Sequence, residues 1–321
     1  MNMHIRTFIR KSRKAIDGGR DILRGRRKAI YAHPMDGIHV QADFIPDIDA
    51  TPSDVEIAER LLRSYSLATA DDPERGTGTN EDIWTAIARR QGSFLDVLQS
   101  NNPERLASYL CNMNRYDATH GTVQGEDEYR HLKRSASYRR FVARMAKDVL
   151  PKEHKVSVCE IGGGVGRLAY WATRFGIGKY TLIDLPRINL LQGFFLLKAL
   201  PDAKVYLYGE PFLHDDDHTT CVYVMPHHAC VHSSGQFDLV VNQDSFPEIN
   251  ATIVSNYLSW IKVSTRSFLS INHESEPHSV NGALQNNVPE LIARVGGFLR
   301  RSRQLYWLRK GYVCELYDIV G

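Results

Sequence analysis

The sequence contains no pair of cysteines at the C-x-x-C spacing, and no apolar run as long as the roughly 18 residues that a membrane-spanning helix needs. Its five cysteines are scattered along the chain, which argues against a disulfide framework or a zinc knuckle and favours a reducing, cytoplasmic compartment. The first residues are charged, so they do not predict a secretory signal. With 43% hydrophobic and 24% charged residues, the composition is that of an ordinary soluble protein.

Positive charge is concentrated at the N-terminus, although the net charge of the whole chain is only +3. Residues 1–31 contain ten of the forty Lys and Arg residues and two acids, and residues 32–50 follow as a proline-containing linker. Such charge runs are commonly solvated extensions, and we favour this interpretation for residues 1–50. The alternative is a basic arm that contacts anionic lipid at the inner face of the membrane, a phosphorylated glycan carrier or nucleic acid.

The rest of the chain divides into a helical region and an α/β region. Apolar residues recur at helical spacing through residues 51–150, which begin with a capping signature at Thr51 or Ser53. In residues 151–321, short β-branched runs alternate with helical stretches, which predicts parallel strands joined by helical crossovers. The last two β runs flank a turn at Lys310-Gly311 and predict an antiparallel hairpin. We therefore expect an α/β fold with a Rossmann-like, seven-stranded, mostly parallel sheet, preceded by a helical region that caps it.

Four glycines lie between a strand-like run and a helix-like run in the segment VCEIGGGVGRLAYW, residues 158–171. No Lys followed by Ser or Thr comes after them, which excludes a P-loop. The frame that begins at Gly164 fits the G-x-G-x-x-[GA] spacing of a dinucleotide loop, so this alternative stays open on spacing alone. Glu160 disfavours it, because a carboxylate just before the glycines would face the negative pyrophosphate. A carboxylate there suits a ligand with a positive amino group and no phosphate, such as S-adenosylmethionine.

The glycine segment reads E-x-G-x-G-x-G and resembles the first motif of the class I S-adenosylmethionine-dependent methyltransferases. A second acid, Asp184, ends the next strand-like run, where it can accept both hydrogen bonds of a ribose diol. A tight turn or a helix cap would explain either feature alone. Together, in order and each at a strand end, they predict a cofactor site. The predicted cofactor-binding residues are Glu160, Gly162, Gly163, Gly164, Gly166, Asp184, Leu185 and Asn242.

A later segment, VYVMPHHACVHSSGQFDLVVNQDSFPEINATIVSNYLSWI, resembles a family of sugar O-methyltransferases found in bacterial polysaccharide contexts. That family has a strand that ends in Asn, an N-x-x-S-F-x-E-M segment and then a helix that carries an Ile and a Tyr. The matching residues here are Asn242, Ser245, Phe246, Glu248, Ile253 and Tyr257, with Ile249 in place of the Met. The resemblance covers about residues 120–321. It implies a class I methyltransferase fold and transfer of a methyl group from S-adenosylmethionine to a hydroxyl of a sugar or glycan precursor.

The candidate catalytic residues follow two strand-like runs whose carboxyl ends we expect to face the cofactor. Methyl transfer depends mainly on alignment, and a base near a weakly nucleophilic hydroxyl adds to it. His273 is the first choice, because an unperturbed imidazole titrates near neutrality, although the same histidine would also serve as a hydrogen-bonding group of a loop. Asp244 is the second choice. Glu248 is the third, with bracing of its loop as the alternative role.

Other ligands and other functions are weaker expectations. Asp215, Asp216 and Asp217 are consecutive, so their side chains point in different directions, and we predict an exposed loop tip here. A divalent metal that polarises the acceptor is the weaker alternative. Nucleic acid is not an expected substrate, because no N/D-P-P-[YF] signature follows the run that ends at Asn242. Three alternatives to sugar methylation stay open: methylation of another small metabolite, a nicotinamide-dependent oxidoreductase, and a non-catalytic binding module of methyltransferase shape. The oligomeric state is not predicted.

Overall fold

The structure is a computed structural model. It describes residues 51–71, 92–119, 142–144, 146–147, 149–150, 155–211, 219–232, 236–274, 279–280, 283–306 and 311–320. The predictions for residues 1–50 and for Asp215 to Asp217 lie outside these ranges.

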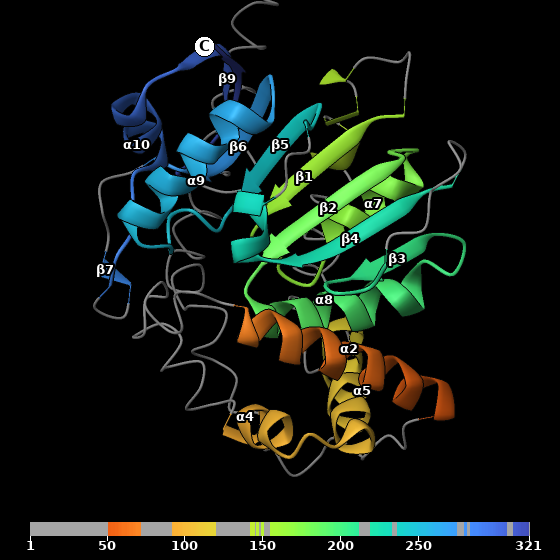
Figure 1. The fold of residues 1–321 in the computed structure, drawn as a ribbon. Helices are drawn as coiled ribbons and strands as arrows, with labels where there is room; N and C mark the ends of the chain where they lie inside the picture. Colours follow the sequence, from red (N-terminus) through yellow and green to blue (C-terminus); the bar gives the residue numbers. More distant parts are fainter. Residues whose placement is uncertain are drawn as a thin grey trace, which may run out of the picture. The chain divides into compact units, whose positions relative to one another are not determined.

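Eight strands form one sheet in the order β3-β4-β2-β1-β5-β6-β10-β9 (Figure 1). All neighbours are parallel except β10, which is antiparallel to both β6 and β9. Two further short strands, β7 and β8, pair with each other. The strands are β1 Ser157–Ile161, β2 Lys179–Asp184, β3 Lys204–Leu207, β4 Cys221–Pro226, β5 Leu239–Gln243, β6 Ser267–His273, β7 Ser279–Val280, β8 Ala283–Leu284, β9 Phe298–Leu305 and β10 Tyr312–Ile319.

The mostly parallel sheet and the C-terminal hairpin are confirmed, but the expected number of seven strands is wrong. The missed strand is β4, with the sequence CVYVMP, which lies between β3 and β2. Its first two residues are buried, and buried and half-buried residues alternate from Val222 to Pro226, so the β pattern is present. No helix among the described residues separates β3 from β4. The strand therefore breaks the alternation of strands and helices from which the number was predicted.

Helices cover both faces of the sheet. On one face, α7 and α8 share a hydrophobic core with α2 and α5, and α4 contacts α5. On the other face, α9 and α10 pack in a second core. Among the described residues, no helix combines the length and apolar character needed to cross a bilayer. The helices are α2 Pro52–Ala70, α4 Gly92–Gln99, α5 Pro103–Thr119, α7 Arg167–Arg174, α8 Pro186–Ala199, the 3-10 helix η2 His227–His232, α9 Ala251–Ser264 and α10 Val288–Val295.

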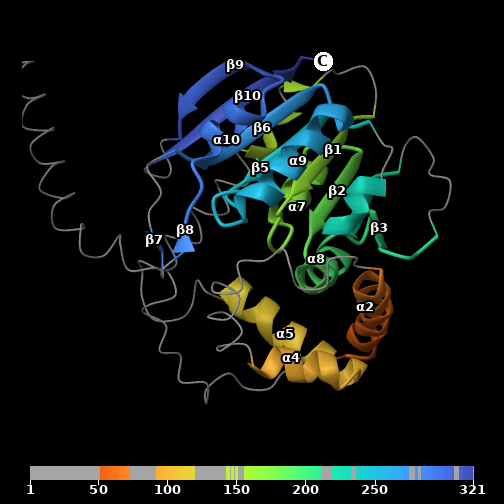
Figure 2. The same ribbon diagram turned by 60° about the vertical axis from the view of Figure 1, so that its left-hand side comes forward.

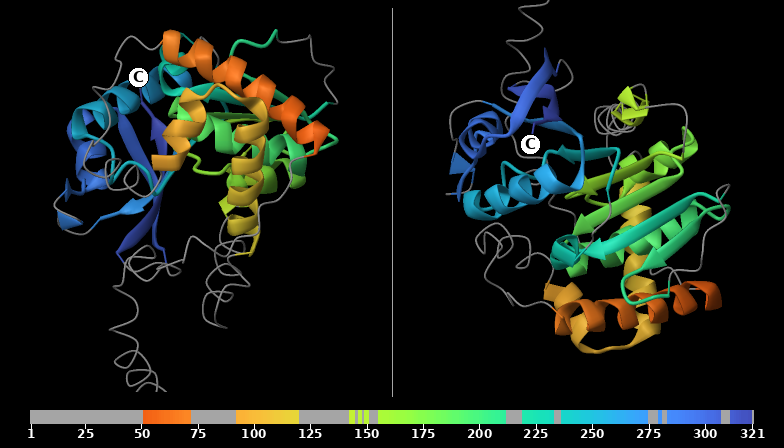
Figure 3. Two further views of the ribbon diagram at one scale, coloured as in Figure 1. Left: turned by 90° about the horizontal axis from the view of Figure 1, so that it is seen from below. Right: turned by 45° about the horizontal axis from the view of Figure 1, so that its top comes forward.

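Helix α2 begins where its sequence predicts and is joined to the α/β core. Thr51 Oγ1 accepts from the N–H of Asp54 at 3.3 Å, and Asp54 accepts from the N–H of Thr51 at 3.0 Å, which is a capping box. Asp54 also pairs with Lys198 of α8, and Arg60 makes a two-point ion pair with Glu210 at 2.8 and 2.9 Å. Figures 2 and 3 show α2 beside α8, on the side away from the sheet. Helical structure in residues 51–150 is thus confirmed for α2, α4 and α5, and its role as a cap stays a prediction.

The C-terminal hairpin has a buried carboxylate at its centre. Glu315 of β10 accepts hydrogen bonds from Arg300 at 3.0 Å and Arg303 at 2.8 Å, both on β9, and from Tyr317 Oη at 2.7 Å. Burial and the hydrogen bond to Glu315 raise the pKa of Tyr317, so its hydroxyl stays a donor. These bonds fix β9 to β10, and β10 in turn pairs with β6 at the edge of the candidate site.

The order of the strands reverses between β1 and β5, because β2 lies on one side of β1 and β5 on the other. At such a point the crossovers run in opposite directions. Open α/β sheets bind their ligands in a crevice at the carboxyl ends of the central strands, so we expect a ligand of this chain at these strand ends. The residues at the ends of β1, β2, β5 and β6 define the candidate site.

Candidate functional site

The glycine loop joins β1 to α7 in a backbone conformation that favours glycine. Gly162, Gly164 and Gly166 have φ angles of 74°, 57° and 86°, in the left-handed region. The N–H of Gly162 donates to the carbonyl of Ile183 at 2.8 Å, so this residue continues the pairing of β1 with β2. Gly166 is the N-cap of α7. A Cβ added to Gly164 would meet no heavy atom of the described residues within 4 Å, so there is open space at the middle of the loop.

Replacing Gly162 with alanine is expected to lower the free energy of unfolding by about 2–4 kcal/mol. The added Cβ would lie 2.1 Å from Oγ of Ser245, and the φ of 74° adds backbone strain. Gly164→Ala is the matched control, because its φ is also positive but its Cβ meets nothing among the described residues. The control should cost only about 1–2 kcal/mol. Denaturant titrations of the ligand-free variants measure both values, and equal losses would contradict the steric explanation.

Glu160 is fully buried at the carboxyl end of β1. Its Oε2 accepts a hydrogen bond from Tyr180 Oη at 2.9 Å. Gly163 packs directly on the carboxylate, because a Cβ at this position would lie only 3.0 Å from the same oxygen. A buried carboxylate is costly unless positive charge or donors compensate it. Its place beside the glycine loop puts this carboxylate at the candidate site.

Asp184, at the end of β2, accepts three hydrogen bonds. Its Oδ1 accepts from the N–H of Leu185 at 2.9 Å, and its Oδ2 accepts from the N–H of Gly164 at 3.3 Å and from Gln192 Nε2 at 2.9 Å. Burial, and to a smaller extent the charge of Glu160, raise the pKa of Asp184 to about 7, although the three hydrogen bonds act to lower it. The carboxyl group therefore changes its protonation near neutral pH. Additional donors from a ligand would favour the ionised form.

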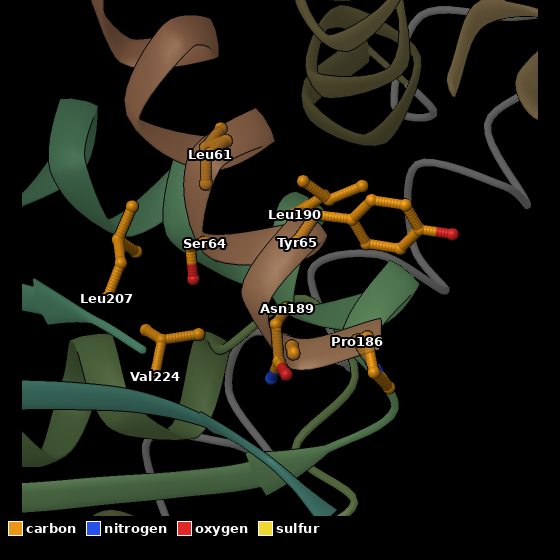
Figure 4. Close-up of a pocket in the computed structure, with 9 residues that line it drawn as sticks. Leu61, Ser64, Tyr65, Pro186, Asn189, Leu190, Leu207 and Val224 are labelled. Carbon is orange, nitrogen blue, oxygen red and sulfur yellow. The ribbon is translucent and has the colours of Figure 1, made fainter. Parts of the chain in front are cut away.

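A chain of hydrogen-bonded side chains leads from Asp184 to a pocket beside α2. Gln192, fully buried on α8, donates to Asp184 and accepts from Asn189 Nδ2 at 2.9 Å. The Oδ1 atom of Asn189 has no hydrogen-bond partner among the described residues. Sequence reasoning missed Gln192, because a single glutamine in a helix belongs to no motif. Figure 4 shows the pocket, which is lined by Leu61, Ser64, Tyr65, Ala68, Pro186, Asn189, Leu190, Leu207 and Val224.

Asn242 faces the opposite side of the sheet from Glu160 and belongs to a buried network. Its Nδ2 donates to the carbonyl of Ile161 at 2.9 Å and to Ser245 Oγ at 2.6 Å. Its Oδ1 accepts from Asn272 Nδ2 at 2.9 Å. The network joins the ends of β1, β5 and β6 and so fixes the walls of the crevice. Contact of Asn242 with a cofactor stays a prediction.

Asp244 follows β5 in a left-handed conformation, with a φ of 68°. Its N–H donates to the carbonyl of Ile271 at 3.1 Å and to Asn272 Oδ1 at 3.0 Å, and these bonds hold the backbone in place. Its Oδ1 accepts a hydrogen bond from Tyr312 Oη. Strained residues of this kind persist where their surroundings over-determine them, and they cluster at functional sites.

His273 and Tyr312 are a cross-strand pair of β6 and β10. Their ring centroids are 5.4 Å apart with an interplanar angle of 71°. The pair brings a residue of the C-terminal hairpin to Asp244, so the two candidate bases contact the same tyrosine. Sequence reasoning missed Tyr312, because the register of an antiparallel pair is not visible in the sequence of one strand.

The S-F-x-E segment divides between the core and the surface. Phe246 is fully buried, with ring centroids 5.9 Å from Tyr257 and 6.3 Å from Phe268. Glu248 has an exposed side chain, and its N–H donates to the carbonyl of Ser245 at 3.0 Å in the turn before α9. The catalytic role of Glu248 stays a prediction, and the loop position agrees with either of its two expected roles.

Four polar groups share one face of the sheet at the carboxyl ends of adjacent strands. They are Asp184 on β2, Glu160 on β1, Gln243 on β5 and His273 on β6. Side chains alternate between faces along a strand, so each lies on the same face as the residue two positions before it. Those preceding residues all belong to the core that contains α7 and α8: Leu182, Val158, Val241 and Ile271. Adjacent strands are about 4.8 Å apart, so the row of polar groups extends over about 15 Å.

No protein-family model and no curated protein matches the sequence. Among solved structures, the chain is similar to the mitomycin 7-O-methyltransferase MmcR, with a TM-score of 0.42 and 14% identity over 63% of this chain and 60% of that chain. It is similar to magnesium protoporphyrin IX methyltransferase from Synechocystis PCC 6803 with bound SAM (TM-score 0.43, 14% identity, 65% of this chain, 91% of that chain). It is also similar to the glycopeptide N-methyltransferase MtfA (TM-score 0.42, 17% identity, 57% of this chain, 95% of that chain). The aligned part thus spans less than two thirds of MmcR.

The strand order of this chain defines its fold class. The sheet is open and parallel around β1, its order reverses between β1 and β5, and the antiparallel β10 lies between β6 and the edge strand β9. This is the Rossmann-like fold of class I methyltransferases, as the sequence predicts.

Proposed function

We propose that this chain is an S-adenosylmethionine-dependent O-methyltransferase that acts on a hydroxyl of a sugar or glycan precursor. The observation that carries the proposal is the row of Asp184, Glu160, Gln243 and His273 along one crevice, beside a loop of left-handed glycines. The row thus presents Asp184 as a hydrogen-bond acceptor for the ribose diol, then Glu160 as a buried anion beside the loop, and then His273 as a candidate base for the methyl acceptor. The sugar acceptor is supported only by the resemblance of residues 242–257 to sugar O-methyltransferases.

The residues present fit S-adenosylmethionine. Open space at Gly164 lets a ligand approach the backbone, and Asp184 can accept from the ribose diol once it is ionised. Glu160 supplies the negative charge that suits the ammonium and the sulfonium, whereas a pyrophosphate would be repelled. When bound, the cofactor supplies a methyl group on a positively charged sulfur. Among the described residues no three His, Cys, Asp or Glu side chains are grouped to hold a metal ion, and the proposal needs none.

The chain's own contribution to the reaction is positioning and one proton transfer. The Asn242 network and the strained backbone of Asp244 hold the end of β5 in place. Tyr312 donates to Oδ1 of Asp244 and thereby orients the carboxylate. We assign Asp244 to accept the proton of the acceptor hydroxyl as its oxygen bonds to the methyl group, with His273 as the competing base. Alignment of the two reactants supplies the rest of the rate.

The test of the proposed function compares glycans and small metabolites from cells with and without the gene by mass spectrometry. Cells without the gene should lack the mass of one CH₂ group on a glycan or glycan precursor, and a plasmid copy should restore it. Loss of a methyl group from a non-glycan metabolite would replace the sugar with that acceptor. Unchanged glycans and metabolites, together with binding of S-adenosylmethionine, would favour the non-catalytic alternative.

Two predictions accompany the proposed function without bearing on its chemistry. We place the protein in the cytoplasm, where both S-adenosylmethionine and nucleotide-linked sugars are made. We retain contact of the basic residues 1–31 with anionic lipid as the alternative to a solvated arm. Sedimentation with vesicles that contain anionic lipid, with and without residues 1–31, distinguishes the two interpretations.

A further inference from the structure

Gln243 is a buried polar side chain without a hydrogen bond from the described part of the chain. It is the last residue of β5 and is only 2% exposed. Both Oε1 and Nε2 of its amide lack a hydrogen-bond partner among the described residues. A buried amide in this state costs free energy relative to a hydrated one. Such a group calls for a partner, and a ligand in the adjoining crevice can provide it.

The position of Gln243 indicates which part of a ligand it meets. The register of β5 on β1, and the hydrogen bond from Gly162 to β2, place Gln243, Gly162 and Asp184 at one level in three adjacent strands. Gly162 has no side chain, so nothing from β1 stands between the two polar groups. Glu160 lies two residues before this level, on the same face. Gln243 is thus adjacent to the glycine loop and to the carboxylate that we assign to the cationic end of the cofactor.

We propose that the Gln243 amide binds the α-amino-acid end of S-adenosylmethionine, an inference that rests on the proposed function. Nε2 donates to the carboxylate of that group, and Oε1 accepts from its ammonium. A primary amide matches a zwitterion in this way, because it presents a donor and an acceptor side by side. Asp184 then binds the ribose on the other side of Gly162. The acceptor is left to the side of β6 and β10, where Asp244 lies against Tyr312.

The experiment uses calorimetry on the full-length chain with two probes, S-adenosylhomocysteine and 5′-methylthioadenosine. Both contain adenine and ribose, but only the first has the amino-acid end. Gln243→Leu should weaken binding of S-adenosylhomocysteine about 10- to 100-fold and leave that of 5′-methylthioadenosine within about twofold. Equal losses for both probes, or no loss for either, would overturn the inference.

Thermal unfolding separates a binding role from a structural one. Leucine at position 243 removes an amide that the described residues leave unbonded, so the Tm of the ligand-free protein should stay the same or rise. Gln192→Leu is the matched control, since Gln192 is equally buried but is bonded to both Asn189 and Asp184. Its Tm should fall. A fall of the same size for Gln243→Leu would overturn the inference. If the wild-type chain binds neither probe, the proposed function itself fails, which is a distinct result.

Discussion

Replacing Asp184 with alanine is expected to weaken binding of 5′-methylthioadenosine by about 100-fold or more. This probe carries the ribose and adenine of the proposed cofactor without its amino-acid end. An ionised carboxylate that accepts two ribose hydroxyls gains about 1.5–3 kcal/mol from each bond, and alanine removes both. The measurement is calorimetry at about pH 8, above the pKa of about 7 that burial gives Asp184. Retention of most of the affinity would contradict the ribose role.

The same carboxyl group should make the affinity depend on pH. Its native pKa of about 7 lies above the ordinary 3.8 because of burial. Between these values the folded protein holds a proton that the unfolded chain has lost, so this group makes the ligand-free protein less stable as pH rises from about 4 to 7. Affinity changes with pH in the opposite direction from stability, because binding needs the ionised form. Affinity should rise about tenfold per pH unit up to about pH 7 and then stay constant. Asp184→Asn should remove the slope, whereas a flat wild-type profile would contradict the assignment.

Sequence patterns predict the parts of the fold in which a local arrangement of residues recurs along the chain. Strand-like and helical runs alternate in residues 151–321, and each crossover helix must pack on the sheet, so the pattern is visible residue by residue. The capping box at Thr51 and Asp54 is equally local, and the structure confirms it. Strand β4 was missed because no helix among the described residues separates it from β3.

The sequence predicts those residues of the candidate site that follow from the positions of strand ends. It does not predict those that depend on which face of the sheet each strand residue occupies. The place of Glu160 beside the glycines and of Asp184 at the end of the next strand-like run predicts both residues. On β5, the sequence reasoning selected Asn242, yet Gln243 is the residue that shares a face with Glu160. A shift of one residue moves a side chain to the other face. Because β5 is buried on both faces, no alternation of apolar and polar residues reveals which of its residues lie on which face of the sheet.

Replacing Asp244 with asparagine is expected to lower kcat by about 10²- to 10⁴-fold, the range for loss of a general base. Asparagine keeps the shape of the side chain and tolerates the left-handed backbone at φ 68°, so the fold should not suffer. Tyr312→Phe should lower kcat less, by about tenfold, because it removes only the hydrogen bond that orients the carboxylate. Initial rates are measured with the acceptor that the comparison of glycans identifies.

His273→Asn tests the competing base in the same assay, because Asp244 and His273 both lie against Tyr312. If Asp244 accepts the proton, His273→Asn should reduce kcat far less than Asp244→Asn does. The reverse order would assign the base to His273, the first choice from the sequence. In each variant the affinity for S-adenosylhomocysteine should stay within about twofold of the wild type, because neither side chain is assigned to the cofactor. A loss of kcat with a matching loss of that affinity would instead indicate that Asp244 holds the cofactor.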